Sequence, residues 1–207
     1  MKQPNSARQA VAYLKRADPL FGEVIRRVGP CPWTGRSDHT HFGYVLRSVV
    51  YQQLSGKAAA TIFGRVQALY GGKSPTPEQL AGTPIPKLRA AGLSGRKAEY
   101  AHDLAERVRS GEILLDAFDS ISDDEVLANL VRVRGIGRWT GQMVLMFHLA
   151  RPDVFPELDL GVQKALQRLL RLRKLPSPER TATLGKRWAP YRTVAAWYLW
   201  RSLELPE

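Results

Sequence analysis

Apolar residues recur at helical spacing along most of the chain. Two segments show this spacing most plainly, at Val45, Leu46, Val49 and Val50 and again at Val126, Leu127, Leu130 and Val131. Runs in which apolar and polar residues alternate strictly, as in a half-buried strand, are hard to find. The pattern predicts an all-α fold of about ten helices.

Several predicted helices begin at residues that cap a first turn. The segment Ser122-Asp123-Asp124-Glu125 has the order of a capping box, in which the first and last side chains bond each other's backbone. A capping residue followed by proline marks three further starts, at Asp18-Pro19, Thr76-Pro77 and Ser177-Pro178. Pro190 is predicted to occupy the first turn of the last helix, where its missing N–H costs nothing.

The chain contains no internal repeat and no linker long enough to separate independent domains. We therefore expect one compact unit over residues 1–207, built of two helical lobes beside a central cleft. One lobe comprises residues 42–150 and contains a hairpin of helices at 125–149. The other comprises residues 1–41 together with 151–207.

The charge of the chain favours a polyanionic partner such as nucleic acid. Its 31 Lys and Arg residues outnumber 19 Asp and Glu residues, which gives a formal net charge of +12. A basic protein of another function would share this property. No apolar run approaches the roughly 18 residues that span a bilayer, and the first residues lack the apolar stretch of a signal peptide. We expect a monomeric cytoplasmic protein, associated with the nucleoid in a prokaryote, and no membrane partner.

Cys31 is the only cysteine. An intrachain disulfide and an iron–sulfur cluster held by four thiolates are therefore excluded. Cys31, His39 and His41 have metal-ligand chemistry, but no fourth ligand follows at a recognised spacing, so we expect no zinc site.

Two glycines mark a candidate phosphate site between two predicted helices. Gly135 and Gly137 lie one residue apart, which permits a tight hairpin and a close approach of the backbone to another surface. The following helix begins near Arg138 and directs N–H groups outward with partial positive charge. Gly135, Gly137, Arg138 and Thr140 are therefore candidate phosphate-binding residues. An αα-hairpin without any function explains the glycines equally well when they are taken alone.

Three stretches together resemble the helix-hairpin-helix DNA glycosylases, and within them the DNA-3-methyladenine glycosylase II branch. They are residues 49–60 (VVYQQLSGKAAA), 135–140 (GIGRWT) and 154–162 (VFPELDLGV), and residues 187–200 resemble the closing helix of that family. The resemblance implies a hydrolase of base excision repair. Such an enzyme flips an alkylated base, of the 3-methyladenine or 7-methylguanine type, out of double-stranded DNA and cleaves its N-glycosidic bond.

Asp159 matches the acidic residue that this family places beyond the hairpin. Breaking the glycosidic bond builds positive charge on the sugar, and a nearby carboxylate stabilises that charge and activates the attacking water. Asp159 also precedes an apolar periodic run, so a role as a helix cap is the alternative, and the two roles are compatible. Asp153 and Glu157 are interpreted as solvated loop residues.

The resemblance assigns further residues to the base and to the duplex. Trp139 occupies the position where bifunctional relatives carry a catalytic lysine, so we expect hydrolysis by water and no lyase activity. Trp139 and Trp200 match aromatic residues of the base pocket, with plain core packing as the alternative. Gln53 and Leu54 match the side chains that fill the gap left by the flipped base, and for Leu54 burial in the core is the alternative.

No cofactor is expected to be required. By resemblance, a monovalent cation, sodium or potassium, is held at the hairpin by the backbone carbonyls of Val131, Val133 and Ile136. Basic residues that can border the cleft are Arg36, Lys57, Arg96, Lys97, Arg134, Arg138, Lys164 and Arg168. Two other functions remain open: a non-catalytic DNA-binding module that uses the hairpin only to grip phosphates, and a glycosylase for other damaged or mismatched bases.

Overall fold

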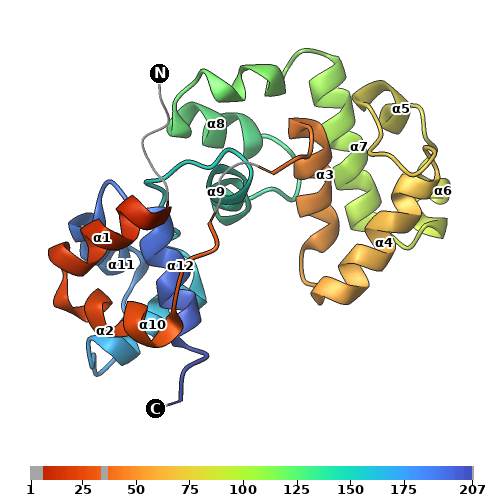
Figure 1. Cartoon of the computed structure of the whole chain (residues 1–207). Helices are drawn as coiled ribbons and strands as arrows, with labels where there is room; N and C mark the ends of the chain where they lie inside the picture. Colours follow the sequence, from red (N-terminus) through yellow and green to blue (C-terminus); the bar gives the residue numbers. More distant parts are fainter. Residues whose placement is uncertain (1–6, 34–36, 207) are drawn as a thin grey trace. The chain divides into compact units, whose positions relative to one another are not determined.

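The computed structural model describes residues 7–33 and 37–206, and every regular element in this part of the chain is a helix (Figure 1). The all-α class predicted from the sequence is confirmed. The chain divides into two compact units, Ser37–Leu149 and a second made of Met1–Arg36 and Ala150–Glu207. The boundaries drawn from the sequence at 41/42 and 150/151 lie close to those of the two units.

The unit formed by residues 37–149 is built around one long helix. Its α-helices are α3 (His41–Tyr51), α4 (Gly56–Ala68), α5 (Pro77–Ala81), α6 (Ile85–Ala90), α7 (Gly95–Arg109), α8 (Asp123–Leu130) and α9 (Arg138–Phe147), with a 3-10 helix at Leu115–Asp119. Helix α7 packs against α3, α5 and α6, and α9 packs against α3 and α8 (Figure 1). Fully buried residues at helical spacing, such as Val45, Val49 and Leu104, form its core.

The other unit contains α1 (Ala7–Ala17), α2 (Pro19–Val28), α10 (Leu160–Leu169), α11 (Pro178–Gly185), a 3-10 helix at Lys186–Trp188 and α12 (Arg192–Ser202). Its core includes the fully buried side chains of Phe21, Trp188 and Tyr198. Asp18 caps α2 through the N–H of Leu20 and also accepts a 3.0 Å hydrogen bond from the indole of Trp188. One carboxylate thus caps the start of α2 and satisfies a buried indole.

The helix caps test the local predictions from the sequence. The capping box is confirmed, because Ser122 Oγ accepts from the N–H of Glu125 and the Glu125 carboxylate accepts from the N–H of Ser122. The prediction for Pro190 is wrong. Helix α12 begins at Arg192, two residues later, and its first turn bonds instead to the 151–154 segment through the N–H of Thr193 and the carbonyl of Pro152. Among the described residues, no helix is long and apolar enough to cross a membrane.

Candidate functional site

The hairpin between α8 and α9 requires glycine at Gly135 for two reasons. Its φ of +77° lies in the left-handed region, which side chains with a Cβ rarely adopt. A Cβ at this position would also lie 2.1 Å from the ring of Tyr100 on α7. The hairpin backbone therefore packs directly on the Tyr100 ring, and this contact sets the distance between the hairpin and α7.

Helix α9 begins without a side-chain cap. Its N-cap residue is Gly137, and α6 and α12 likewise lack a side-chain cap. An Asp, Ser or Thr side chain caps each of the helices α2, α3, α4, α5, α7, α8, α10 and α11. A helix end whose N-cap residue has no side-chain oxygen suits an external anion. Arg138 in the first turn is exposed, but Thr140 is buried and its hydroxyl accepts from Gln52, so the Thr140 side chain supports the hairpin from inside.

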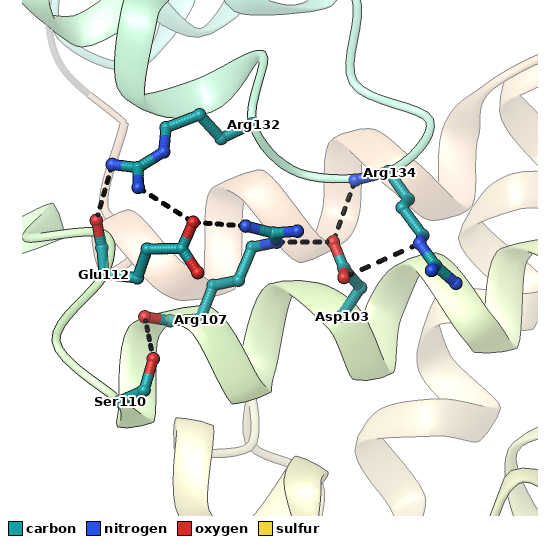
Figure 2. Close-up of polar contacts among 6 residues, drawn as sticks. All are labelled: Asp103, Arg107, Ser110, Glu112, Arg132 and Arg134. Atoms are coloured by element: carbon teal, nitrogen blue, oxygen red, sulfur yellow. Dashed lines mark hydrogen bonds and ion pairs between the residues drawn. The ribbon is translucent and has the colours of Figure 1, made fainter.

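Two acidic side chains tie the hairpin to its own lobe, as Figure 2 shows. Asp103 on α7 accepts hydrogen bonds from the backbone N–H of Arg134 at 2.9 Å and from Arg107 at 3.0 Å. Glu112 in turn binds Arg107 and Arg132. The pKa of Arg107 is raised, mainly by its hydrogen bond with Asp103. The backbone on the N-terminal side of Gly135 is thus held by a continuous network of charges.

A pocket of about 590 Å³ opens beside the hairpin. Helix α3 contributes Tyr44 and Tyr51 to its lining, and α9 contributes Trp139 and Met143. Trp139 is 42% exposed, so it is a surface aromatic and the core-packing alternative fails. The pocket therefore offers aromatic faces from both helices, with the thioether of Met143 beside them.

The residues that α3 turns toward this pocket, Tyr44, Arg47, Ser48 and Tyr51, were not identified from the sequence. The guanidinium of Arg47 lies 3.8 Å from the centroid of the Tyr51 ring, in a cation–π contact. Tyr44 stacks on the buried His148 at 4.5 Å, and burial raises the pKa of its phenol. The signal was present, because these residues recur at helical spacing on the side of α3 opposite to its apolar stripe.

The turn that follows α3, residues 52–55, is called the wedge turn below. Its Gln53 and Leu54 are both exposed, with 39% of Leu54 accessible, so burial of Leu54 in the core is excluded. Both residues also line the pocket. The structure thus places the two predicted wedge residues beside Trp139, on one surface of one unit.

Asp159 is the N-cap of α10 and lies in the other unit. Its Oδ1 accepts from the backbone N–H of Val162 and from the indole Nε1–H of Trp200, each at 2.8 Å. A Cβ at Gly161 would lie 3.0 Å from both Oδ1 and the indole, so glycine there keeps the pair together. The predicted capping role is present, and two donors hold the carboxylate in one orientation.

Asp159 differs in its surroundings from Asp153, an acidic residue near it in the sequence. Leu158 and Leu160 on either side are exposed, so an apolar surface flanks the carboxylate. The interpretation of Asp153 as a solvated residue is wrong, since it forms a two-pronged ion pair with Arg192 at 2.8 and 2.9 Å. This ion pair fixes the start of α12, the helix that carries Trp200.

A family model described as "HhH-GPD superfamily base excision DNA repair protein" matches residues 46–190. The chain belongs to this superfamily. The match contains the wedge turn, the hairpin and Asp159, whereas Trp200 lies beyond it. The resemblance described from the sequence is confirmed.

Individual relatives match most of the chain. "DNA-3-methyladenine glycosylase 1" of Schizosaccharomyces pombe is 34% identical over 205 residues, which cover 98% of this chain and 90% of that protein. "Putative DNA-3-methyladenine glycosylase YfjP" of Bacillus subtilis is 34% identical over 173 residues, and the chain spans 60% of its length. The solved structure of S. pombe Mag1 in complex with abasic DNA has a TM-score of 0.82 at 33% identity, and the match covers 95% of this chain and 97% of that one.

The basic residues predicted to border the cleft differ in how their side chains are placed. Lys57, Arg96, Arg134, Arg138 and Lys164 are exposed. Arg168 donates to the backbone carbonyls of Ser202 and Leu205, and Lys97 donates to the carbonyls of Val50 and Gln52. Arg36 lies outside the described residues. The five exposed side chains are accessible to an external phosphate, whereas Lys97 and Arg168 are turned toward backbone carbonyls.

The hairpin carbonyls proposed for a monovalent cation belong to Val131, Val133 and Ile136. Val131 is the C-cap of α8, and helix-end carbonyls commonly lack an intrahelical donor. The Val133 carbonyl accepts the N–H of Ile136 at 3.1 Å and has a second lone pair for another ligand. Among the described residues, no group of three or more His, Cys, Asp or Glu side chains is placed to hold a metal ion.

Proposed function

We propose that the chain is a monofunctional DNA glycosylase that removes alkylated purines, of the 3-methyladenine and 7-methylguanine type, from double-stranded DNA. Relatives named as 3-methyladenine glycosylases match nearly the whole chain. The observation that carries the proposal is the Asp159 carboxylate, held by two N–H donors and flanked by exposed leucines. A module that only grips phosphates needs no such group.

In the proposed reaction, Asp159 acts on the sugar of the flipped nucleotide. The bond between C1′ and the base nitrogen breaks, and its electron pair leaves with the base. The carboxylate stabilises the positive charge that develops on the sugar. A water oxygen then bonds to C1′ and transfers its proton to Asp159. The products are a free base and an intact strand with an abasic sugar.

Trp139 supports hydrolysis by water rather than by a lysine. A lysine nucleophile forms an imine with C1′ and leads to strand cleavage. Here the first turn of α9 presents an indole at that position, and the described residues that line the neighbouring pocket include no lysine. We infer that the enzyme has no lyase activity.

The pocket beside the hairpin supports the preference for alkylated purines. An N3- or N7-alkylated purine carries positive charge, which aromatic faces attract. Trp139, Tyr44 and Tyr51 supply such faces, although Arg47 already covers one face of Tyr51. We infer that the indole of Trp139 is the main aromatic contact for the charged base.

The uncapped start of α9, the exposed Arg138 and the net charge of +12 support binding to the DNA backbone. We propose that a monovalent cation at the carbonyls of Val131, Val133 and Ile136 adds positive charge to the same hairpin. Action on chromosomal DNA implies location with the genome, in the cytoplasm if the cell is a prokaryote. We expect the protein to act as a monomer.

The proposal is tested by incubating the purified protein with methylated duplex DNA and measuring the release of free bases. We expect 3-methyladenine and 7-methylguanine in solution and an unbroken strand until alkali is added. Binding to damaged duplex without any base release would identify a non-catalytic module. Release of oxidised or mismatched bases, but not of methylated ones, would identify a glycosylase of the other class.

A further inference from the structure

The wedge turn adopts a backbone conformation that its own residues do not favour. Gln53 has a φ of +55°, in the left-handed region that residues other than glycine rarely occupy. The N–H of Leu54 bonds the carbonyl of Tyr51, the last residue of α3, at 3.4 Å, which is long for a backbone hydrogen bond. Contacts from outside the turn are therefore needed to hold it in place.

Lys97 supplies such contacts from the first turn of α7. Its Nζ donates to the carbonyl of Val50 at 2.8 Å and to that of Gln52 at 2.5 Å. Both carbonyls lie at the C-terminal end of α3, where helix carbonyls lack partners and partial negative charge accumulates. Burial lowers the pKa of Lys97, in keeping with an ammonium turned toward the protein. The second bond fixes the peptide group that immediately precedes the strained Gln53.

Gln52 extends this contact to the hairpin. Its Nε2 donates to the carbonyl of Gly135 at 2.9 Å and to the hydroxyl of Thr140 at 3.4 Å. The residue whose carbonyl Lys97 holds therefore binds both sides of the hairpin turn. These bonds run from α7 to the end of α3 and on to the start of α9, all within one unit.

We propose that Lys97 and Gln52 are positioning residues that hold the wedge turn in its strained conformation and link it to the phosphate-binding hairpin. Through this link, the side chains that enter the duplex and the backbone that grips it keep a fixed spacing. The importance of that spacing for damaged DNA rests on the proposed function, whereas the rigidity of the turn is a property of the free protein. In the proposed reaction, neither residue acts on the sugar or on the attacking water.

The first test measures hydrogen exchange in the free protein. In Lys97→Met, which keeps the apolar stem but removes the ammonium, the amides of the wedge turn should exchange at least about tenfold faster, as expected from losing two charge-assisted hydrogen bonds. Lys87→Met is the matched control, because Lys87 is exposed on α6 and the substitution and charge change are identical. Exchange in Lys97→Met equal to that of Lys87→Met would overturn the proposal.

The second test measures affinity for duplexes with and without an abasic-site analogue. The preference for the abasic duplex should fall about tenfold in Lys97→Met and stay unchanged in Lys87→Met, because both variants lose one charge but only one loosens the turn. When Gln53 and Leu54 are already alanine, Lys97→Met should cost nothing more. If Lys97→Met lowers the preference further in this background, Lys97 does not act through the wedge residues. If the wild type shows neither this preference nor base release, the proposed function fails while the exchange result still stands.

Gln52→Leu keeps the size of the side chain and tests the link, also in case Lys97→Met does not fold. We expect faster exchange both in the wedge turn and at residues 135–140. Loosening of only one of the two segments would show that Gln52 does not join them.

Discussion

The two units present their candidate functional groups in opposite ways. In the unit of residues 37–149, the side chains of Gln53, Leu54 and Trp139 are exposed. The backbone next to them is hydrogen-bonded by the less exposed residues Lys97 and Gln52. In the other unit, the functional candidate Asp159 is itself bonded twice and caps a helix. Side chains that must enter a duplex need freedom at their tips, whereas a carboxylate that faces a developing cation needs one fixed orientation.

The largest expected effect concerns Asp159. Asp159→Asn keeps an oxygen for Val162 and Trp200 but removes the charge, so base release should fall at least about a hundredfold while DNA binding persists. Single-turnover release from methylated duplex and a binding titration measure the two quantities. The control Asp153→Asn makes the same change at the ion pair with Arg192. It should lower the thermal stability of the protein and leave most of the base release. Near-full release by Asp159→Asn would show that its role is only structural.

The second effect concerns the wedge residues. In Gln53→Ala combined with Leu54→Ala, affinity for a duplex with an abasic site should fall roughly tenfold or more, the range for losing a buried leucine side chain. Affinity for undamaged duplex should fall much less, because the wedge acts only after the stack opens. Titrations with the two duplexes measure the difference. Equal losses of affinity for both duplexes would show that these residues stabilise the fold instead of acting as a wedge.

The third effect separates hydrolysis from lyase chemistry at Trp139. The wild type should form no complex with abasic DNA that borohydride traps, and it should not cut the strand. Trp139→Ala should lose about 2- to 30-fold in release of charged alkylpurines, from a cation–π contact of roughly 0.5 to 2 kcal/mol, and less on neutral bases. Reproducible trapping by the wild type would reject attack by water, whatever the preference for bases.

Features of the fold and the site could be predicted from the sequence where they depend on residues that are close together in the chain. The capping box at Ser122 and the positive φ of Gly135 depend on a few neighbouring residues, so their sequence patterns identified them. The role of Trp200 could not be predicted in this way, because its indole meets Asp159 from a residue 41 positions away. The interior roles of Lys97 and Asp103 were likewise hidden, since a charged residue on an amphipathic helix usually faces water. Tertiary contacts, which periodicity does not encode, decided these cases.

The smallest expected effect concerns the network in Figure 2, and it tests whether the hairpin is rigid in the way that Asp159 is. Asp103 carries a carboxylate that is 17% exposed and bonds the N–H of Arg134, so a substitution there acts on the hairpin without touching DNA. Asp103→Asn keeps one acceptor and loses the charge, which should cost about 1 kcal/mol of the free energy of unfolding. Chemical denaturation measures this cost. Glu106→Gln, on the same helix and paired with the exposed Arg109, is the control and should cost less. Because the contacts proposed for the hairpin are with the DNA backbone and not with bases, Asp103→Asn should weaken binding to abasic and undamaged duplexes by the same factor. A selective loss on abasic duplex would assign Asp103 to the wedge instead.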